Sequence, residues 1–291
     1  MKKSPVARLA CLSAGLVLAS APESPAAILF QENFNYAAGD LVANSGGRWG
    51  VDNVQNTLFT LQDPGWGTGM AVKTEPVTNG NQRARATVDL TGYTNSTVYV
   101  SMWVDVLPVP TANGGNGSDN GARYVAAGLW NGPATTNTEM VYFGKRSNAT
   151  AGWGIFNPGT NTDSSKSPHG IDGPTQIVLR IDFDSAGNET QRLYALDING
   201  IPSVEPAVAD ATFAGYNFSL PTNNIVDLRF SSGGNNGGAN GNANWGMWDN
   251  FGVFTEWSDL AIINANIPEP TSLLLLAGGA AGLFSRRRRT L

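Results

Sequence analysis

The sequence predicts an all-β protein, an antiparallel β-sandwich with an N-terminal signal helix and a short C-terminal transmembrane helix. Three observations support this prediction. Short segments rich in β-branched and aromatic residues recur between turns of Gly, Asn, Asp and Pro, which is typical of a sandwich or barrel. No stretch of the central chain has a convincing helical pattern. Each end of the chain combines an apolar run with basic residues.

The strongest strand signals lie in the middle of the chain. Residues 175–184 (TQIVLRIDFD) and 190–198 (TQRLYALDI) are separated by a turn at 185–188 and predict a hairpin. Residues 96–107 (STVYVSMWVDVL) alternate and predict a central strand buried on at least one side. We expect further strands at 28–34, 57–61, 69–74, 82–90, 123–130, 139–145, 153–157, 226–230 and 245–254.

The N-terminus has the pattern of a signal peptide over residues 1–27. Three basic residues precede an apolar run at 9–19, and cleavage is expected after Ala26 or Ala27. Signal peptidase and the export machinery are therefore expected partners. Cys11 is the only cysteine and leaves with the signal peptide, so the mature chain has no disulfide and needs a hydrophobic core.

The C-terminus carries a three-part signal. Pro268-Glu269-Pro270 precedes an apolar run at 273–284, which is followed by Arg286, Arg287, Arg288 and Arg289. This order resembles the PEP-CTERM sorting tag of exported bacterial proteins. The resemblance implies transient anchoring in the inner membrane, cutting by an exosortase, and a final place at the cell surface or outside it. The alternative is an ordinary anchor, although residues 271–284 span only about 21 Å as a helix, against about 30 Å of hydrocarbon.

These signals divide the chain into a signal peptide (1–27), a β-sandwich (28–257), a linker (258–267) and a sorting tag (268–291). Charge is distributed unevenly among them. The signal and the tag hold seven of the 18 basic residues and two of the 23 acidic ones, which leaves the rest with a net charge of -10. Such a surface repels phosphate backbones, so nucleic acid is not an expected partner. It suits divalent cations or neutral glycans.

The body also resembles a known fold family. The opening Glu32-Asn33-Phe34-Asn35-Tyr36, the central hairpin and the late Trp248-Asp249-Asn250-Phe251-Gly252-Val253 are similar to a concanavalin A-like, laminin-G-type jelly roll. The resemblance implies that the first and last strands pair, which would bring Phe34 near Phe251.

Tryptophans near Gly-rich turns are the candidate ligand-binding residues. Exposed aromatic faces stack on sugar rings, so the sequence predicts polysaccharide binding through Trp245, Trp248, Trp130 and Trp153. The alternative is that these side chains fill the core, as most tryptophans in a sandwich do.

Calcium is the metal that the sequence suits best, because Asp, Asn and loop carbonyls supply its oxygen ligands. Asp182 and Asp184 superficially resemble part of a calcium loop, but Ala186 stands where a third ligand is wanted, and a plain turn is the alternative. Asp249 and Asn250 are further candidates, with turn formation as their alternative.

Glycoside hydrolysis needs two carboxylates beside one cleft. The Glu-x-Asp-x-x-Glu pattern of jelly-roll glucanases does not occur in the sequence, and the nearest match is Asp182-Phe183-Asp184. We therefore expect a non-enzymatic surface or extracellular-matrix protein whose sandwich binds polysaccharide or has a structural role. The alternative is a glucanase-like hydrolase with a non-standard carboxylate pair.

Overall fold

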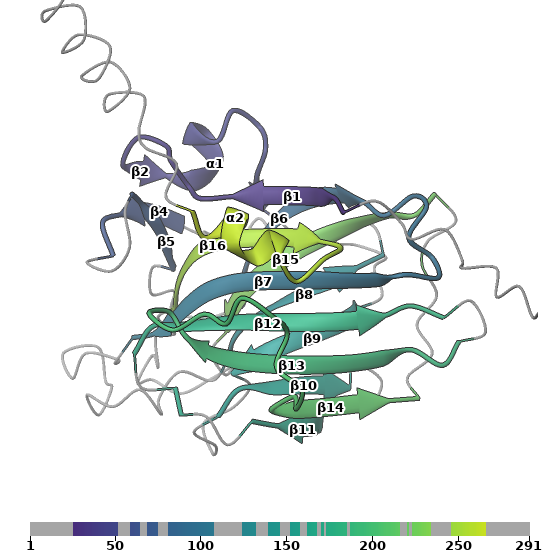
Figure 1. The fold of residues 1–291 in the computed structure, drawn as a ribbon. Coiled ribbons are helices and arrows are strands. Elements are labelled where there is room, and N and C mark those ends of the chain that lie inside the picture. The colour runs from purple at the N-terminus through teal and green to yellow at the C-terminus, as the bar shows by residue number, and fades with distance from the viewer. Residues whose placement is uncertain are drawn as a thin grey trace, which may run out of the picture.

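The computed structural model describes residues 26–51, 59–64, 69–74, 81–107, 124–131, 139–145, 152–157, 162–167, 170–171, 173–184, 187–215, 220, 223–233 and 246–265. These residues form antiparallel strands and two short helices, α1 (Leu41–Asn44) and α2 (Asp259–Ile263). The strands make two sheets that lie as two layers (Figure 1). The prediction of an antiparallel, all-β sandwich is confirmed.

Sheet A has nine strands, and its internal strands β7, β12 and β13 are the ones that the sequence predicted most clearly. Its order is β14-β13-β12-β7-β16-β5-β4-β2, and β1 pairs with the second half of β16. The bounds of these strands are β1 Ile28–Glu32, β2 Gly39–Asp40, β4 Phe59–Gln62, β5 Ala71–Thr74, β7 Thr97–Val106, β12 Thr175–Asp182, β13 Thr190–Asp197, β14 Ala211–Ala214 and β16 Gly246–Phe254. The predicted hairpin is β12–β13, in register from Thr175–Asp197 to Asp182–Thr190.

Sheet B has seven strands in the order β11-β10-β9-β8-β15-β6-β3. Their bounds are β3 Gly50–Val51, β6 Asn81–Asp89, β8 Tyr124–Trp130, β9 Glu139–Lys145, β10 Gly154–Asn157, β11 Thr162–Lys166 and β15 Ile225–Gly233. The sequence did not predict β2, β3, β11 or β14. All four lie at the ends of their sheets and are two to five residues long, and β11 is polar throughout.

The main core lies between the sheets and follows from strand alternation, since alternate side chains point to opposite faces. From β7 it receives Val98, Val100, Met102, Val104 and Val106, as the sequence predicted. From β6 it receives Ala84, Ala86 and Val88, and from β15 Val226, Leu228 and Phe230. The intervening residues of each strand therefore face away from the core, and they form the two outer faces of the sandwich.

The first and last long strands pair, as the resemblance implied. Glu32 of β1 lies opposite Phe251 of β16, and the rings of Phe34 and Phe251 meet edge to face, with centroids 6.0 Å apart. The buried carboxylate of Glu32 accepts hydrogen bonds from the Phe34 N–H (2.8 Å), the Tyr36 hydroxyl (2.6 Å) and Trp49 Nε1 (3.0 Å). The Glu and Tyr of the opening Glu-Asn-Phe-Asn-Tyr therefore have a structural role, because the Glu32 carboxylate fixes the chain that follows β1 through Phe34 and Tyr36.

Residues 259–263, which lie within the linker expected at 258–267, form α2. Leu260 and Ile263 lie on one face of this helix and are buried against the outer side of sheet A (Figure 1). Ile263 packs on Gly252 of β16, where an added Cβ would lie 2.2 Å from Ile263 Cδ1. The sandwich therefore extends past residue 257.

No helix within the described ranges is long and apolar enough to cross a membrane. Most of the predicted signal helix and the whole predicted transmembrane helix lie in residues 1–25 and 266–291, outside those ranges.

Candidate functional site

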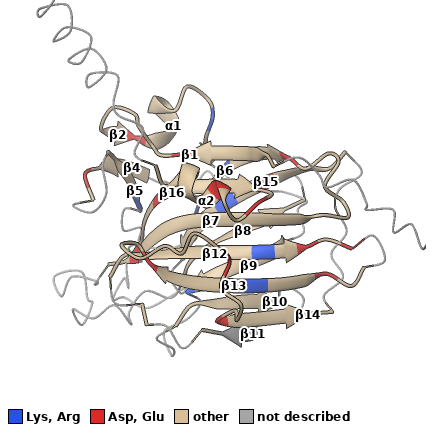
Figure 2. Ribbon diagram, viewed as in Figure 1, with Lys and Arg blue, Asp and Glu red and all other residues tan. Residues whose placement is uncertain are grey.

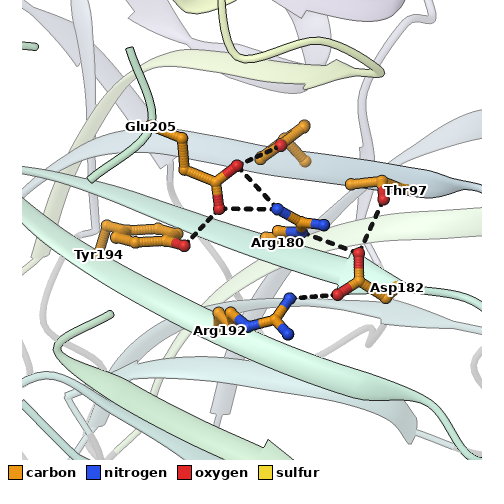
Figure 3. A network of polar contacts seen from close by, with 7 residues as sticks. Thr97, Arg180, Asp182, Arg192, Tyr194 and Glu205 are labelled. Carbon is orange, nitrogen blue, oxygen red and sulfur yellow. Dashed lines mark hydrogen bonds and ion pairs between the residues drawn. The ribbon is translucent and has the colours of Figure 1, made fainter. Parts of the chain in front are cut away.

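The outer face of sheet A carries a network of charged and hydroxyl side chains (Figure 3). Strand register assembles it, because Arg180 of β12 lies between Tyr99 of β7 and Arg192 of β13, and Asp182 lies opposite Thr97. Figure 2 shows the corresponding basic bands on β12 and β13. The remaining member, Glu205, comes from the segment between β13 and β14.

In this network both oxygens of the Glu205 and Asp182 carboxylates accept hydrogen bonds or pair with arginine. Glu205 accepts hydrogen bonds from Arg180 Nη1 (2.8 and 3.0 Å), from the Tyr99 hydroxyl (2.7 Å) and from the Tyr194 hydroxyl. Asp182 accepts from the Thr97 hydroxyl (2.7 Å) and Arg180 Nε (2.8 Å), and it pairs with Arg192. The two arginines and the two carboxylates balance in charge. The network therefore attaches residue 205 to the sheet.

Both carboxylates are held ionised. Burial alone would raise the pKa of Glu205, but hydrogen bonds from Tyr194, Tyr99 and Arg180 outweigh burial and lower it. The pKa of Asp182 is lowered in the same way, with burial opposed by Thr97, Arg180 and Arg192. A glycosidase needs one carboxyl with a raised pKa to protonate the leaving group. Asp182 and Glu205 do not form such a pair.

The rest of this outer face is covered. Tyr99 stacks on Phe254, with centroids 5.3 Å apart, and Trp257 packs against both Tyr99 and Tyr194. The Trp257 indole donates to the Pro202 carbonyl at 3.0 Å. These contacts and α2 place a second apolar cluster on the outer side of sheet A. This part of the face is closed by the chain itself.

The expectation of exposed tryptophans is wrong for the three that are described. Trp153 and Trp248 are 0% exposed, and Trp130 is 7% exposed. Trp248 points into the main core, where its ring lies 5.1 Å from that of Phe230, because it occupies an inward position of β16. Trp153 is in the same core. Trp245 lies outside the described residues.

The predicted calcium ligands are not brought together. Asp182 is engaged by Thr97, Arg180 and Arg192, and Asp184 follows it past the end of β12. Asp249 lies opposite Trp103 on β7, six residues from the Asp182 partner Thr97, which is about 20 Å along the strand. Among the described residues, no group of three or more His, Cys, Asp or Glu side chains is placed to hold a metal ion. Calcium binding stays a prediction.

Asp249 and Asn250 occupy an irregularity in β16. The register with β7 shifts between Asp249 and Gly252, and Asn250 has a left-handed φ of 47°. Asp249 is 1% exposed and accepts a hydrogen bond from the Asn250 N–H at 2.7 Å. Burial raises the pKa of Asp249 to about 8; the Asn250 hydrogen bond opposes this rise and the charge of Glu32 adds to it. A carboxyl so deeply buried cannot reach a glycosidic oxygen.

The outer face of sheet B has a different composition. Outward positions of β6 and β15 supply Arg83, Arg85, Asp227 and Arg229, and β8 supplies Trp130. The guanidinium groups of Arg229 and Arg83 lie 4.4 and 5.1 Å from a ring centroid of Trp130, within cation–π range. Asp227 Oδ2 is 3.3 Å from Arg85 Nη1 and 3.1 Å from Arg229 Nη2. We call these five residues the arginine cluster.

Aromatic side chains adjoin the arginine cluster on the same face. Tyr142 of β9 lies beyond Gly128 of β8, and its hydroxyl is 3.2 Å from the Ser231 hydroxyl. Its ring packs against Phe156 of β10, with centroids 5.0 Å apart. Guanidinium groups that contact the Asp227 carboxylate therefore lie on the same face as two packed aromatic rings, of which Tyr142 is half-buried and Phe156 is buried.

Sequence reasoning did not single out the arginine cluster. A signal was present, since Arg83 and Arg85 alternate with the inward Ala84 and Ala86 and so had to share the outer face. The pairing of β6 with β15, which brings Arg229 beside Arg85, has no signature in the sequence.

Comparisons with known proteins match the C-terminus and the fold. Residues 266–289 match the PEP-CTERM protein-sorting motif, which implies an exported, membrane-transiting protein that is processed by exosortase, a membrane protease. All residues of the predicted sorting motif, from Pro268 to Arg289, are within this match and outside the described structure. No curated protein sequence matches the chain.

Several solved structures are similar to the chain at low identity. An alginate lyase in complex with alginate trisaccharide is 10% identical, with a TM-score of 0.47 over 78% of this chain and 97% of that one. An endo-1,3-beta-glucanase from Streptomyces sioyaensis is 14% identical, with a TM-score of 0.47 over 81% and 98%. A CBM22-1 xylan-binding domain from Paenibacillus barcinonensis is 10% identical, with a TM-score of 0.35 over 79% and 96%. These similarities carry no conclusion about what this chain binds.

Proposed function

We propose that this protein is an exosortase-processed component of the cell surface or extracellular matrix, whose sandwich binds extracellular polysaccharide and is not an enzyme. Signal peptidase removes residues 1–27, and residues 268–291 hold the chain in the inner membrane until exosortase cuts. The body is a jelly roll of the laminin-G type. The PEP-CTERM match supports the sorting part of this proposal.

The binding part rests on the outer face of sheet B. The arginine cluster there lies beside Tyr142 and Phe156 on one side of five neighbouring strands, β6, β15, β8, β9 and β10. Polar groups beside aromatic rings are the combination that orients and stacks sugars. Arg83, Arg85 and Tyr142 are half-buried on this face, whereas Arg229, Asp227, Trp130 and Phe156 are buried. The middle of the outer face of sheet A is covered by α2 and the residue 198–210 segment.

A glycan-array screen of the full chain, purified in detergent and assayed with and without calcium, tests the binding proposal. We expect binding to at least one polysaccharide, with no release of reducing ends on prolonged incubation. Silence across the array from a folded protein would contradict binding and favour a purely structural role. Release of reducing ends would instead support the glucanase-like alternative. Binding that requires calcium would restore the metal prediction.

The sorting part has its own test in a host that carries an exosortase. Replacing the tripeptide through Pro268→Ala, Glu269→Ala and Pro270→Ala should leave the uncut chain in the membrane fraction, as judged by its mass. The Arg286→Lys variant keeps the positive charge and serves as a matched control that should still be cut. Normal cutting of the triple variant would show that the tripeptide is not the recognition element.

A further inference from the structure

We infer that the layer covering the outer face of sheet A is a membrane-contact surface, which rests on the lipid headgroups of the inner membrane while the sorting tag is attached. We call α2 and residues 198–210 together the covering layer. This inference rests on the proposed function, in which residues 268–291 hold the chain in the membrane. It identifies the surface of the sandwich that the membrane meets.

Exposed apolar side chains gather in the covering layer. Val208, Val204 and Ile262 are 82%, 72% and 53% exposed, and these are the highest values among the large apolar side chains of the described residues. The other two exposed ones, Val51 and Ile225, belong to sheet B and are 39% and 40% exposed. Single exposed apolar residues are common on protein surfaces. Three in one layer indicate a surface that meets an apolar phase.

Helix α2 is apolar on both of its sides. Leu260 and Ile263 face the sheet and are buried, while Ala261 and Ile262 are exposed. A surface helix of a globular protein normally carries polar residues on its outer side. The outer side of α2 therefore suits the boundary between water and lipid better than water alone.

The 198–210 segment presents its two valines from a fixed backbone. Glu205 is held by hydrogen bonds from Arg180 and two tyrosine hydroxyls, and Ala209 packs against the second apolar cluster. Val204 and Val208 each precede one of these attached residues and are themselves exposed. The segment is thus attached to the sheet at the positions beside both valines.

The two parts of the covering layer are joined to each other. The indole of Trp257, two residues before α2, donates a hydrogen bond to the Pro202 carbonyl at 3.0 Å. Leu260 and Ile263 of α2 belong to the apolar cluster against which Ile201 of the segment packs. The exposed valines and Ile262 therefore belong to one continuous layer.

The chain leaves the sandwich from the middle of this face. Ile263, at the end of α2, packs on Gly252 of β16. Gly252 pairs with Ser101 of β7, and Ser101 pairs with Val178 of β12. These three strands are internal strands of sheet A. The outer face of sheet A is therefore the face nearest to the sorting tag.

The connection to the membrane is short. Leu273, where the apolar run of the tag begins, is ten positions after Ile263. A flexible chain of ten residues spans about 17 Å on average, whereas a sandwich of this size is about 45 Å across. The connection therefore brings the covering layer to the headgroups and turns the outer face of sheet B away from them.

Contact through the covering layer is apolar in character. Beneath it Arg180 and Arg192 are balanced by Asp182 and Glu205, and the exposed Glu256 before α2 adds a negative charge. Attraction to anionic headgroups needs a basic surface. Three aliphatic side chains bind a bilayer weakly alone, so contact depends on the short connection, which gives an effective concentration in the millimolar range. Cutting by exosortase thus frees this face.

Single-cysteine probes test this inference, because Cys11 is the only cysteine of the chain. The full chain with Cys11→Ser is purified from the membranes of an exporting host without exosortase and is reconstituted in phosphatidylcholine vesicles. A fluorophore is attached at Ile262→Cys or Val204→Cys, and at Ile225→Cys in sheet B as the control. Lipids with a nitroxide on the headgroup should quench the first two probes at least threefold more than the third, with or without 0.5 M NaCl.

Lengthening the connection provides an independent test. Insertion of about 20 Gly and Ser residues between Ala265 and Asn266 keeps both the sandwich and the tag. It should lower quenching at Ile262→Cys at least twofold, because effective concentration falls as a linker grows longer. The lengthened chain should still float with the vesicles.

A matched pair of double variants tests the valines. Val204→Ser with Val208→Ser should lower quenching at Ile262→Cys at least twofold, because it removes apolar side chains from the contact. Val51→Ser with Ile225→Ser makes the same kind of change in sheet B and should leave quenching at Ile262→Cys unchanged. Equal effects of the two double variants would overturn the assignment of the valines to the membrane-contact surface.

The remaining outcomes separate the inference from the function on which it rests. A chain that floats with the vesicles but is quenched equally at Ile262→Cys and Ile225→Cys would overturn the membrane-contact surface and leave anchoring intact. A chain that does not float with the vesicles would overturn both. Protection of Ile262→Cys only when exosortase is present in the vesicles would assign the covering layer to the protease and overturn contact with lipid.

Discussion

On the outer face of sheet A, two arginines meet two carboxylates, and every carboxylate oxygen accepts a hydrogen bond or pairs with an arginine. On the outer face of sheet B, Arg85 and Arg229 contact one aspartate, and Arg229 and Arg83 lie over Trp130. Both arrangements sit on neighbouring strands and project from outward positions. They differ in burial, because the side chains of Arg229 and Asp227 are 1% and 9% exposed, whereas those of Asp182 and Glu205 are 27% and 20% exposed.

The sheet A network connects residue 205 to the sheet, so its interactions are complete in the free protein. Of the arginine cluster, Arg83 and Arg85 are half-buried, and these are the members that a bound polysaccharide would contact. We therefore expect changes in the sheet A network to act on unfolding, and changes at Arg83 and Arg85 to act on polysaccharide binding.

The largest expected effect on stability concerns Asp249 of sheet A, whose carboxyl, unlike those of Asp182 and Glu205, is not bound by an arginine of the network in Figure 3. Its pKa is raised to about 8 by burial, so folding favours the protonated form. Stability is therefore greatest below the ordinary pKa of 3.8 and falls as the pH rises toward 8, by up to about 1.4 kcal/mol per pH unit. Asp249→Asn keeps the acceptor for the Asn250 N–H and should stabilise the protein by about 5 kcal/mol at pH 8.

Urea unfolding of the wild type and Asp249→Asn at pH 3 and pH 8 measures this effect. The two curves should converge at pH 3, since the wild-type carboxyl is then protonated in both the folded and the unfolded chain. Lower stability of Asp249→Asn at pH 8, together with stabilisation of the wild type alone by calcium, would contradict a neutral carboxyl. It would identify Asp249 as a cation ligand.

A smaller effect is expected for Glu205. Glu205→Ala leaves Arg180 and two tyrosine hydroxyls without this acceptor, and we expect a loss of about 2 to 3 kcal/mol in the free energy of unfolding. Because the pKa of Glu205 is lowered, its contribution is present above about pH 4.3 and is lost as the pH falls below that value.

Urea unfolding at pH 7 and pH 3 checks the prediction for Glu205. The difference between wild type and Glu205→Ala should shrink at pH 3, and polysaccharide affinity at pH 7 should be unchanged. Glu205→Gln keeps the shape of the side chain and should lie between the two. A loss of affinity in Glu205→Ala with a normal unfolding curve would break the comparison, because sheet A would then take part in binding.

Much of the fold was predictable because strand alternation is visible in one sequence. Residues 96–107 alternate between core and outer positions, and β7 keeps that pattern. The polar edge strand β11 has no such alternation to detect. Helix α2 escaped prediction because five residues are too few to show a helical period, and its position depends on packing against Gly252.

The candidate site was less predictable because exposure and pairing are set by the whole fold. Trp248 and Trp153 border Gly-rich sequence, yet both are buried in the main core, Trp248 at an inward position of β16 and Trp153 just before β10. Asp182 appeared to be a free turn carboxylate, whereas its register beside Thr97 and Arg192 occupies both oxygens. Arg85 and Arg229 are 144 positions apart in the sequence and meet only because β6 pairs with β15.

The smallest stability effects are expected from the matched pair Arg85→Gln and Arg192→Gln, and these test the comparison most directly. Each removes a partly exposed ion pair, which contributes about 0.2 to 1 kcal/mol. Their unfolding midpoints in urea at pH 7 should therefore stay close to each other, while only Arg85→Gln should weaken polysaccharide binding. The two side chains are similarly exposed and undergo the same substitution, so the pair compares the two outer faces. Equal losses of affinity in the two variants would show that the polysaccharide does not bind at the arginine cluster.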